Sequence, residues 1–171
     1  MVEVSVIVVT YNALWEKLKM TINSILMQDD IEYEIIFADD GSKIKWNEKI
    51  VEYVPTSCNC IFVDSENNIG TVSNIFNGIK KARGKYVKVI SPGDCLNGRD
   101  ALKKWVHYMK QSNVDLSFCN AIYYKDDGCV LNVISKPSAP RNVNIYHEKH
   151  NRKKIFIAYL LANDSILGAA V

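Results

Sequence analysis

Val4-Ser-Val-Ile-Val-Val-Thr-Tyr-Asn12 and Glu34-Ile-Ile-Phe-Ala-Asp-Asp-Gly-Ser42 are two apolar stretches that each end abruptly in polar residues, and they decide the fold of this chain. Continuous apolar, β-branched runs are typical of strands that are buried on both faces of a parallel sheet. In open α/β sheets, ligands bind at the carboxyl ends of the strands. The polar residues that we expect at one such crevice, where a nucleotide would bind, are Thr10, Tyr11, Asn12, Asp39 and Asp40.

The rest of the chain alternates strand and helix patterns. Besides strands over residues 3–10 and 33–38, short apolar runs predict strands over 60–63 and 86–90. Apolar residues at intervals of three and four predict helices over 14–27, 44–53, 72–84 and 102–109, and more weakly over 147–161. Residues 116–124 and 130–134 are predicted as two antiparallel strands around an Asp-Gly turn. This order predicts βαβ units and an α/β fold.

Composition limits the classes of protein to which the chain can belong. A length of 171 residues with 48% hydrophobic content suits one compact domain. The 21 basic and 19 acidic residues nearly cancel, so we expect no nucleic acid as a partner. Basic residues gather over 149–154 and could meet an anionic membrane surface, although such a run is usually a solvated helix face. The apolar stretch over 155–162 is far shorter than the roughly 20 residues that cross a bilayer.

The five cysteines favour a reduced protein. Their number is odd, they lack Cys-x-x-Cys spacing, and the N-terminus has no signal-peptide pattern, so we expect a cytoplasmic location. Cys58-Asn-Cys60 could be a metal or redox pair, but one intervening residue is a poor spacing for zinc. Free thiols are the favoured interpretation.

Four motifs occur in order over about residues 3–110: the first stretch quoted above, Asp39-Asp-Gly-Ser42, Asn68-x-Gly70, and Gly84-Lys-Tyr86 followed by a strand. Together they resemble the inverting family 2 glycosyltransferases. The resemblance implies the GT-A fold, a Rossmann-like three-layer αβα sandwich with a mostly parallel central sheet. Members of the family use a nucleotide-activated sugar, most often a UDP-sugar, and many build bacterial surface polysaccharides.

The resemblance also implies roles for single residues. Asp40 matches the carboxylate that accepts a hydrogen bond from the uracil imide, and Asp39 would help to orient its loop. The ring of Tyr11 can stack on a nucleobase, and Thr10 can hydrogen-bond ribose or base edges. Each motif alone could also be an ordinary turn. The residues expected to bind the nucleotide-sugar are Thr10, Tyr11, Asn12, Asp39, Asp40, Asn68, Gly70, Ser91 and Asp94.

The expected metal motif is incomplete. Family members carry Asp-x-Asp after the fourth strand, where a carboxylate helps to hold Mn²⁺ or Mg²⁺ against the diphosphate. Here the stretch is Ser91-Pro-Gly-Asp94, which keeps only Asp94 as a metal ligand. One carboxylate can suffice, because Mg²⁺ keeps several waters and shares substrate phosphates. Alternatively, Asp94 belongs to a β-turn. Ile75 stands where the family often has an arginine that faces the diphosphate.

The general base of an inverting transferase is not evident. Such an enzyme must deprotonate the acceptor hydroxyl, and the family supplies the base from an acidic motif well beyond residue 171. Asp164 is a late carboxylate but does not lie in such a motif. We therefore expect one GT-A domain over 1–171 that looks truncated, with the nucleotide-sugar-binding half over about 1–110 and the start of the acceptor-side half over 111–171.

The sequence thus predicts a glycosyltransferase that moves a sugar from a nucleotide-sugar to a saccharide or lipid-linked acceptor in cell-surface polysaccharide synthesis, at the inner face of the membrane. A nucleotidyltransferase or Rossmann cofactor domain is less favoured, because Thr10-Tyr-Asn-Ala13 has no glycine to admit a pyrophosphate. The other alternative is a non-catalytic nucleotide-binding or assembly module. Such a module would self-associate, for example as a homodimer, through the surface that the acceptor half would cover.

Overall fold

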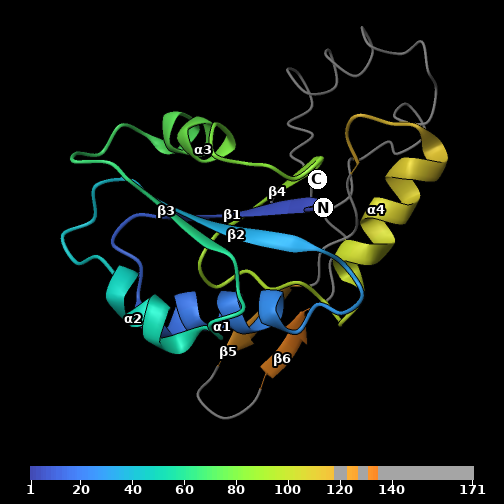
Figure 1. Ribbon diagram of the computed structural model, residues 1–171. Helices are drawn as coiled ribbons and strands as arrows, with labels where there is room; N and C mark the ends of the chain where they lie inside the picture. Colours follow the sequence, from blue (N-terminus) through green and yellow to red (C-terminus); the bar gives the residue numbers. More distant parts are fainter. Residues whose placement is uncertain (118–122, 127–130, 135–171) are drawn as a thin grey trace, which may run out of the picture. The chain divides into compact units, whose positions relative to one another are not determined.

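The computed structural model describes residues 1–117, 123–126 and 131–134, which belong to two compact units, Met1–Leu116 and Ser117–Ala170. In the first unit, strands and helices alternate along the chain (Figure 1). Its elements are β1 (Val4–Thr10), α1 (Trp15–Leu26), β2 (Tyr33–Asp39), α2 (Asn47–Tyr53), β3 (Cys60–Asp64), α3 (Thr71–Ile79), β4 (Tyr86–Ile90) and α4 (Ala101–Ser112). The second unit contains β5 (Tyr123–Asp126) and β6 (Leu131–Ile134).

The sheet of the first unit has four parallel strands in the order β3-β2-β1-β4. Its register sets Thr10 beside Asp39, and Asp39 beside Asp64, so β1, β2 and β3 end at the same level. The strand order reverses next to β1, because β4 pairs with β1 on the side away from β2. Ligands bind outside such a reversal in open α/β sheets. The predicted α/β fold with a mostly parallel sheet is confirmed.

Helices cover both faces of this sheet, with α3 on one face and α1 and α2 on the other (Figure 1). Successive side chains of a strand point to opposite faces, so β1 supplies two cores. Val4, Val6 and Val8 pack in the larger core with residues of α1, α2 and α4. Ile7 lies in the smaller core on the other face. The three-layer arrangement expected from the sequence is therefore present in the first unit.

Helix α2 begins at Asn47, three residues later than predicted. Trp46 precedes it with a non-helical backbone, and its indole Nε1 donates a hydrogen bond to the carbonyl oxygen of Ala13 at 2.9 Å. The ring also packs against Trp15 of α1, with 5.6 Å between the ring centroids. These tertiary contacts hold the segment before Asn47 against α1. The sequence pattern therefore predicted a helix that is longer at its N-terminal end than the helix in the structure.

Two other predicted boundaries are wrong. Helix α3 ends at Ile79 rather than at Gly84, because the chain must turn to bring Gly84 against β1. A Cβ atom on Gly84 would lie 2.5 Å from the backbone nitrogen of Ser5. The strand predicted over 116–124 starts too early, because Leu116 is 63% exposed and outside any strand. Its middle, residues 118–122, lies outside the described residues, and β5 covers Tyr123–Asp126.

The remaining expectations about the elements have mixed outcomes. The antiparallel pairing of β5 with β6 is confirmed. The weak helix over 147–161 and the basic run over 149–154 lie outside the described residues. Within the described residues, no helix has the length and apolar character that a membrane span requires. The single-domain expectation, with a division near residue 110, stays a prediction.

Candidate functional site

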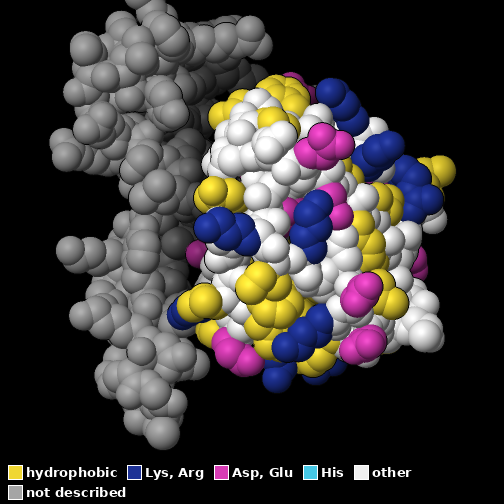
Figure 2. All heavy atoms as spheres, turned by 90° about the vertical axis from the view of Figure 1, so that its left-hand side faces the viewer, with side chains coloured by type: hydrophobic (Ala, Val, Ile, Leu, Met, Phe, Trp, Pro, Cys, Tyr) yellow, Lys and Arg dark blue, Asp and Glu magenta, His cyan; other side chains and the backbone are white. Residues whose placement is uncertain are grey.

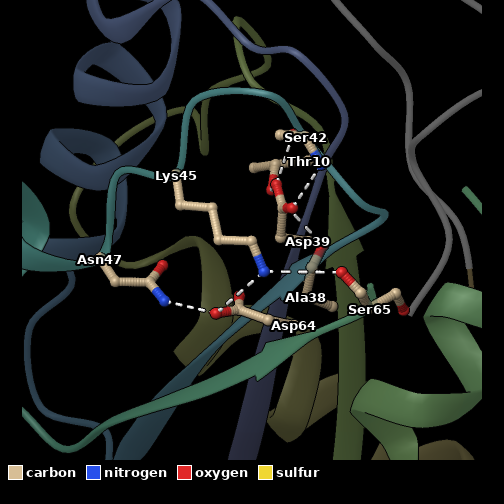
Figure 3. A network of polar contacts seen from close by, with 8 residues as sticks. All are labelled: Thr10, Ala38, Asp39, Ser42, Lys45, Asn47, Asp64 and Ser65. Carbon is tan, nitrogen blue, oxygen red and sulfur yellow. Dashed lines mark hydrogen bonds and ion pairs between the residues drawn. The ribbon is translucent and has the colours of Figure 1, made fainter. Parts of the chain in front are cut away.

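Asp39 connects the ends of β1 and β2. Its carboxylate is buried and accepts hydrogen bonds from Thr10 Oγ1 at 2.8 Å, from the backbone N–H of Ser42 at 2.8 Å and from Ser42 Oγ at 2.5 Å (Figure 3). Charge-assisted hydrogen bonds of this kind are roughly twice as strong as neutral ones. Asp39 therefore orients the loops around it, as the sequence led us to expect, and its carboxylate is largely occupied by the protein itself.

Asn12 fastens the loop after β1 to the loop after β2. Its backbone is left-handed, with φ at 48°, a conformation that asparagine tolerates better than most residues. Its N–H donates to Ser42 Oγ at 2.7 Å, and its side-chain oxygen accepts from the N–H of Lys43 at 3.0 Å. The structure thus gives Asn12 a role in loop geometry, and its predicted contact with a ligand stays a prediction.

Asp40 holds the loop that follows β3. Its buried carboxylate accepts hydrogen bonds from the backbone N–H groups of Ile69 at 2.7 Å and Gly70 at 3.1 Å, one on each oxygen. Its own N–H donates to the carbonyl oxygen of Thr10 at 2.9 Å. Each carboxylate oxygen has a second lone pair, so Asp40 can still accept a hydrogen bond from a ligand.

Gly41 allows these two loops to touch. Its φ is +75°, and a Cβ atom there would lie 2.5 Å from the backbone carbon of Asn67. Any other residue would force the loop after β3 away from Asp40, because the obstacle is backbone rather than a flexible side chain. The glycine of the Asp39-Asp-Gly-Ser42 motif is therefore required by the packing of the loops.

Three further predicted residues, Tyr11, Asn68 and Gly70, lie on the exposed surface of these loops. The ring of Tyr11 is 54% exposed immediately after β1. Asn68 is exposed, and its side-chain oxygen accepts a hydrogen bond from the N–H of Gly70 at 3.1 Å, just before α3. Figure 2 shows the molecule from the side where α2 and the loop between β3 and α3 lie in Figure 1, and basic, acidic and hydrophobic side chains are all present on this face. The predicted residues from β1, β2 and the loop after β3 therefore come together at one edge.

Asp64 is a polar strand end that the sequence analysis missed. It ends β3 and accepts a hydrogen bond from Asn47 Nδ2 at 2.6 Å, and Lys45 Nζ lies 3.5 Å from its carboxylate (Figure 3). Lys45 Nζ also contacts the carbonyl oxygen of Ser65 at 3.5 Å. The strand-end rule that selected Asp39 would have selected Asp64 as well. Lys45 places a positive charge on the edge where the predicted site lies.

The turn after β4 is fixed through its backbone. Thr21 Oγ1 of α1 donates to the carbonyl oxygen of Asp94 at 2.7 Å, lies 3.2 Å from the carbonyl oxygen of Ser91, and accepts from the N–H of Gly93 at 2.9 Å. The N–H of Asp94 donates to the carbonyl oxygen of Ser91 at 3.0 Å, which closes the predicted turn. Because Val8 pairs with Ile90, this turn follows β4 at the same edge of the sheet as the loops above.

The exposed carboxylate of Asp94 is compatible with a metal ion that is bound partly by the protein and partly by a ligand. It is not compatible with a metal ion that is bound by protein side chains alone. In the part of the chain that the structure describes, no group of three or more His, Cys, Asp or Glu side chains could hold a metal ion. Mg²⁺ commonly binds through one or two carboxylates, several waters and substrate phosphates. The residues present therefore fit a metal ion whose coordination is completed by a diphosphate ligand, with Asp94 as the ligand from the protein.

Known proteins resemble this chain in sequence. The family model described as glycosyl transferase family 2 matches residues 5–162. An uncharacterised glycosyltransferase of Methanocaldococcus jannaschii is 27% identical over 165 residues, which cover 96% of this chain and 54% of that protein. The chain thus spans about half the length of this curated relative.

Solved structures resemble it in fold. S. aureus TarS 1-349 in complex with UDP superimposes with a TM-score of 0.59 at 27% identity, over 67% of this chain and 34% of that one. A mannosyltransferase from Pyrobaculum calidifontis, in complex with GDP-Man and Mn²⁺, gives a TM-score of 0.63 at 21% identity, over 68% of this chain and 35% of that one. The expected GT-A fold is confirmed by these neighbours.

Proposed function

Since the chain belongs to glycosyltransferase family 2, we propose that it holds a nucleotide-sugar donor, a UDP-sugar, at the carboxyl ends of β1, β2 and β4. The observation that carries the proposal is the position of Asp40. Its carboxylate is fixed by two backbone N–H groups. Asp40 directly follows β2, whose end lies beside the end of β1, and Tyr11 directly follows β1. A preorganised acceptor close to an exposed aromatic ring suits the imide edge and the face of a uracil.

The solved neighbours support the nucleotide-sugar class. TarS has been solved with UDP and with UDP-GlcNAc, and the mannosyltransferase with GDP-Man. Asp94 would hold Mn²⁺ or Mg²⁺ beside the donor diphosphate. When bound, such a metal neutralises charge on the phosphate oxygens and on the departing nucleotide. Lys45 lies on the same edge, but its charge is paired with the Asp64 carboxylate, so the metal would carry most of the charge compensation for an anionic ligand.

The acceptor side of the proposal rests on the resemblance. In this proposal the acceptor is a saccharide or a lipid-linked saccharide, the product is a cell-surface polysaccharide, and the protein works in the cytoplasm at the inner face of the membrane. An inverting transfer needs a base to take the proton of the acceptor hydroxyl as it attacks the sugar carbon. We assign that base to no residue of 1–171.

Calorimetric titration of UDP into the protein tests the donor site. With Mn²⁺ present we expect binding, and Tyr11→Ala should weaken it about 5- to 150-fold, because stacking of a base on an aromatic ring is worth about 1–3 kcal/mol. Tyr108→Ala is the matched control, since Tyr108 is similarly exposed, at 47%, but lies on α4. Equal losses in the two variants would contradict a base-stacking role for Tyr11.

The same titration tests the metal. We expect a chelator to weaken UDP binding by the wild type, and Asp94→Asn to bind UDP with the same weak affinity whether or not Mn²⁺ is present. Asp115→Asn, at another exposed aspartate, should behave as the wild type does. If the wild type binds no UDP with or without Mn²⁺, the proposed function is wrong. If it binds UDP equally well with chelator, the metal role of Asp94 is wrong.

A further inference from the structure

Two thiols lie side by side at the start of β3. Cys60 is the first residue of the strand and Cys58 lies in the bend before it. Their sulfur atoms are 3.5 Å apart, with Cys60 Sγ as the donor to Cys58 Sγ, and both cysteines are free and partly buried. Two sulfurs at this distance need only small side-chain rotations to come within bonding range, because an S–S bond is about 2.05 Å long.

The contact makes the two thiols chemically unequal. The hydrogen bond from Cys60 stabilises the thiolate of Cys58 and lowers its pKa to about 7, although burial opposes the shift. The same hydrogen bond, together with burial, raises the pKa of Cys60. Near neutral pH, Cys58 is therefore the nucleophile, since the thiolate rather than the thiol attacks disulfides. Tyr33 adds no negative charge nearby, because burial raises the pKa of its hydroxyl to about 12.

The backbone around the pair can accommodate a disulfide. Residues two apart in an extended chain span roughly 7 Å at most, which is close to the usual Cα separation in disulfides of about 4.4–6.8 Å. Cys58 closes a turn in which its N–H donates to the carbonyl oxygen of Pro55 at 2.8 Å. β3 pairs only with β2 in the described sheet, and the carbonyl oxygen of Asn59 accepts a hydrogen bond from the N–H of Ile35 at 2.9 Å, so the disulfide must form mainly by rotation of the two side chains.

We propose that Cys58 and Cys60 form a redox-active dithiol site that small disulfides of the glutathione class oxidise. The Cys58 thiolate attacks one sulfur of glutathione disulfide, which forms a mixed disulfide and releases one glutathione thiolate. Cys60 then loses its proton, its sulfur attacks Cys58 Sγ, and the second glutathione leaves as a thiolate. The two released thiolates take up protons. The net reaction converts two protein thiols and one glutathione disulfide into one protein disulfide and two glutathiones.

The ring that this disulfide closes is small, and strained disulfides have more oxidising potentials and are reduced readily. The pair therefore responds reversibly to the thiol balance of its surroundings and is not a structural crosslink. It lies at the opposite end of β3 from Asp64 and the loops of the candidate site. The redox site therefore does not depend on the proposed function, and UDP binding should persist in both oxidation states.

Peptide mapping after oxidation tests the proposal. The folded protein is incubated with glutathione disulfide and glutathione at several ratios, quenched with acid, alkylated with iodoacetamide and digested with trypsin. The tryptic fragment 50–80 contains Cys58 and Cys60 and no other cysteine. We expect it to lose both alkylation sites and two hydrogen atoms as the ratio becomes more oxidising, and dithiothreitol should restore both sites.

Single variants identify the order of the steps. Cys60→Ser should accumulate a glutathione adduct in fragment 50–80, which the wild type resolves, whereas Cys95→Ser should leave the fragment's behaviour unchanged. Thermal unfolding of each variant checks that the fold is kept. Phenylarsine oxide, which binds paired thiols, should protect the fragment from alkylation in the wild type and in Cys95→Ser, but not in Cys60→Ser. Exposed Cys95 reports whether the oxidant has reacted at all. The proposal fails if Cys95 is glutathionylated while the wild-type fragment stays fully alkylated. It also fails if the wild-type fragment carries as much glutathione adduct as the fragment of Cys60→Ser.

Discussion

At the residue scale, the neighbouring carboxylates of Asp39 and Asp40 accept hydrogen bonds from different loops. Asp39 accepts its hydrogen bonds from Thr10 and Ser42, across the ends of β1 and β2, whereas Asp40 accepts from Ile69 and Gly70 in the loop after β3. A single Asp-Asp pair thus couples three loops at one edge of the sheet. Preorganised acceptors of this kind lower the ordering cost of binding, because little of the loop structure must form when a ligand arrives.

Glu34 is a buried carboxylate with a structural role. Its side chain is fully buried and accepts hydrogen bonds from Ser5 Oγ at 2.6 Å and from the N–H of Arg83 at 2.7 Å. The Arg83 guanidinium also lies 2.7 Å from its carboxylate. Burial raises the pKa of Glu34, but the hydrogen bonds from Ser5 and Arg83 and the charge of Arg83 outweigh it, so the pKa lies below its ordinary value of 4.5.

This pKa shift predicts a dependence of stability on pH. A carboxyl whose pKa is lower in the folded state stabilises the protein above its unfolded pKa, and this stabilisation is lost as the pH falls through the folded pKa. We expect Glu34→Gln to lower the free energy of unfolding by about 1–3 kcal/mol at pH 7. In urea denaturation the difference from the wild type should shrink toward pH 3, and exposed Glu32→Gln should change little. A difference that stays constant from pH 7 to pH 3 would contradict the shift.

The sequence selected residues that the structure places at one edge of the sheet, but it did not predict their contacts. Asp39 and Asp40 were selected because polar residues follow buried strands, and Asp94 was selected because it matches the family's metal motif; the register brings the ends of these strands to one edge. Their partners could not be predicted, because Ile69 and Thr21 approach from distant segments and partly through backbone atoms. What each selected residue does toward a ligand stays a prediction.

At the element scale, burial determined the strands and tertiary contacts determined the ends of the helices. β1 and β2 are almost wholly buried, so their apolar runs located them within one residue. The predicted helix boundaries were wrong where one residue makes a tertiary contact. Trp46, before α2, is hydrogen-bonded to Ala13, and Gly84, after α3, packs on β1. Neither contact has a local sequence signal.

The turn between α3 and β4 allows a direct test of this packing. Gly84→Ala would place a Cβ atom 2.5 Å from the nitrogen of Ser5 and 2.7 Å from the carbonyl carbon of Val4, and neither backbone atom can move without disturbing β1. We expect a loss of about 1–3 kcal/mol in the free energy of unfolding, the usual cost of overpacking. Exposed Lys81→Ala, in the same turn, is the control. A wild-type denaturation midpoint for Gly84→Ala would rule out the tight contact.

At the scale of the whole molecule, the first unit contains what a folded domain needs. The four-stranded sheet and both described hydrophobic cores belong to residues 1–116. Leu18, Ile22 and Ile25 of α1 are each 0% exposed, and burial of such side chains contributes about 1.5–3 kcal/mol apiece. The residues that follow β1, β2 and β4 at the candidate site also lie in this unit.

Residues 1–116 alone should therefore fold, and should unfold in one cooperative transition, because single domains of this size usually behave as two-state systems. Circular dichroism during thermal unfolding measures this, with the whole chain as the control. If the fragment folds, UDP with Mn²⁺ should raise its midpoint as it raises that of the whole chain, since a ligand that binds only the folded state stabilises it. A gradual transition without a midpoint would show that the first unit needs residues beyond 116 for its structure. A cooperative transition that UDP shifts only in the whole chain would show instead that the donor site draws on those residues.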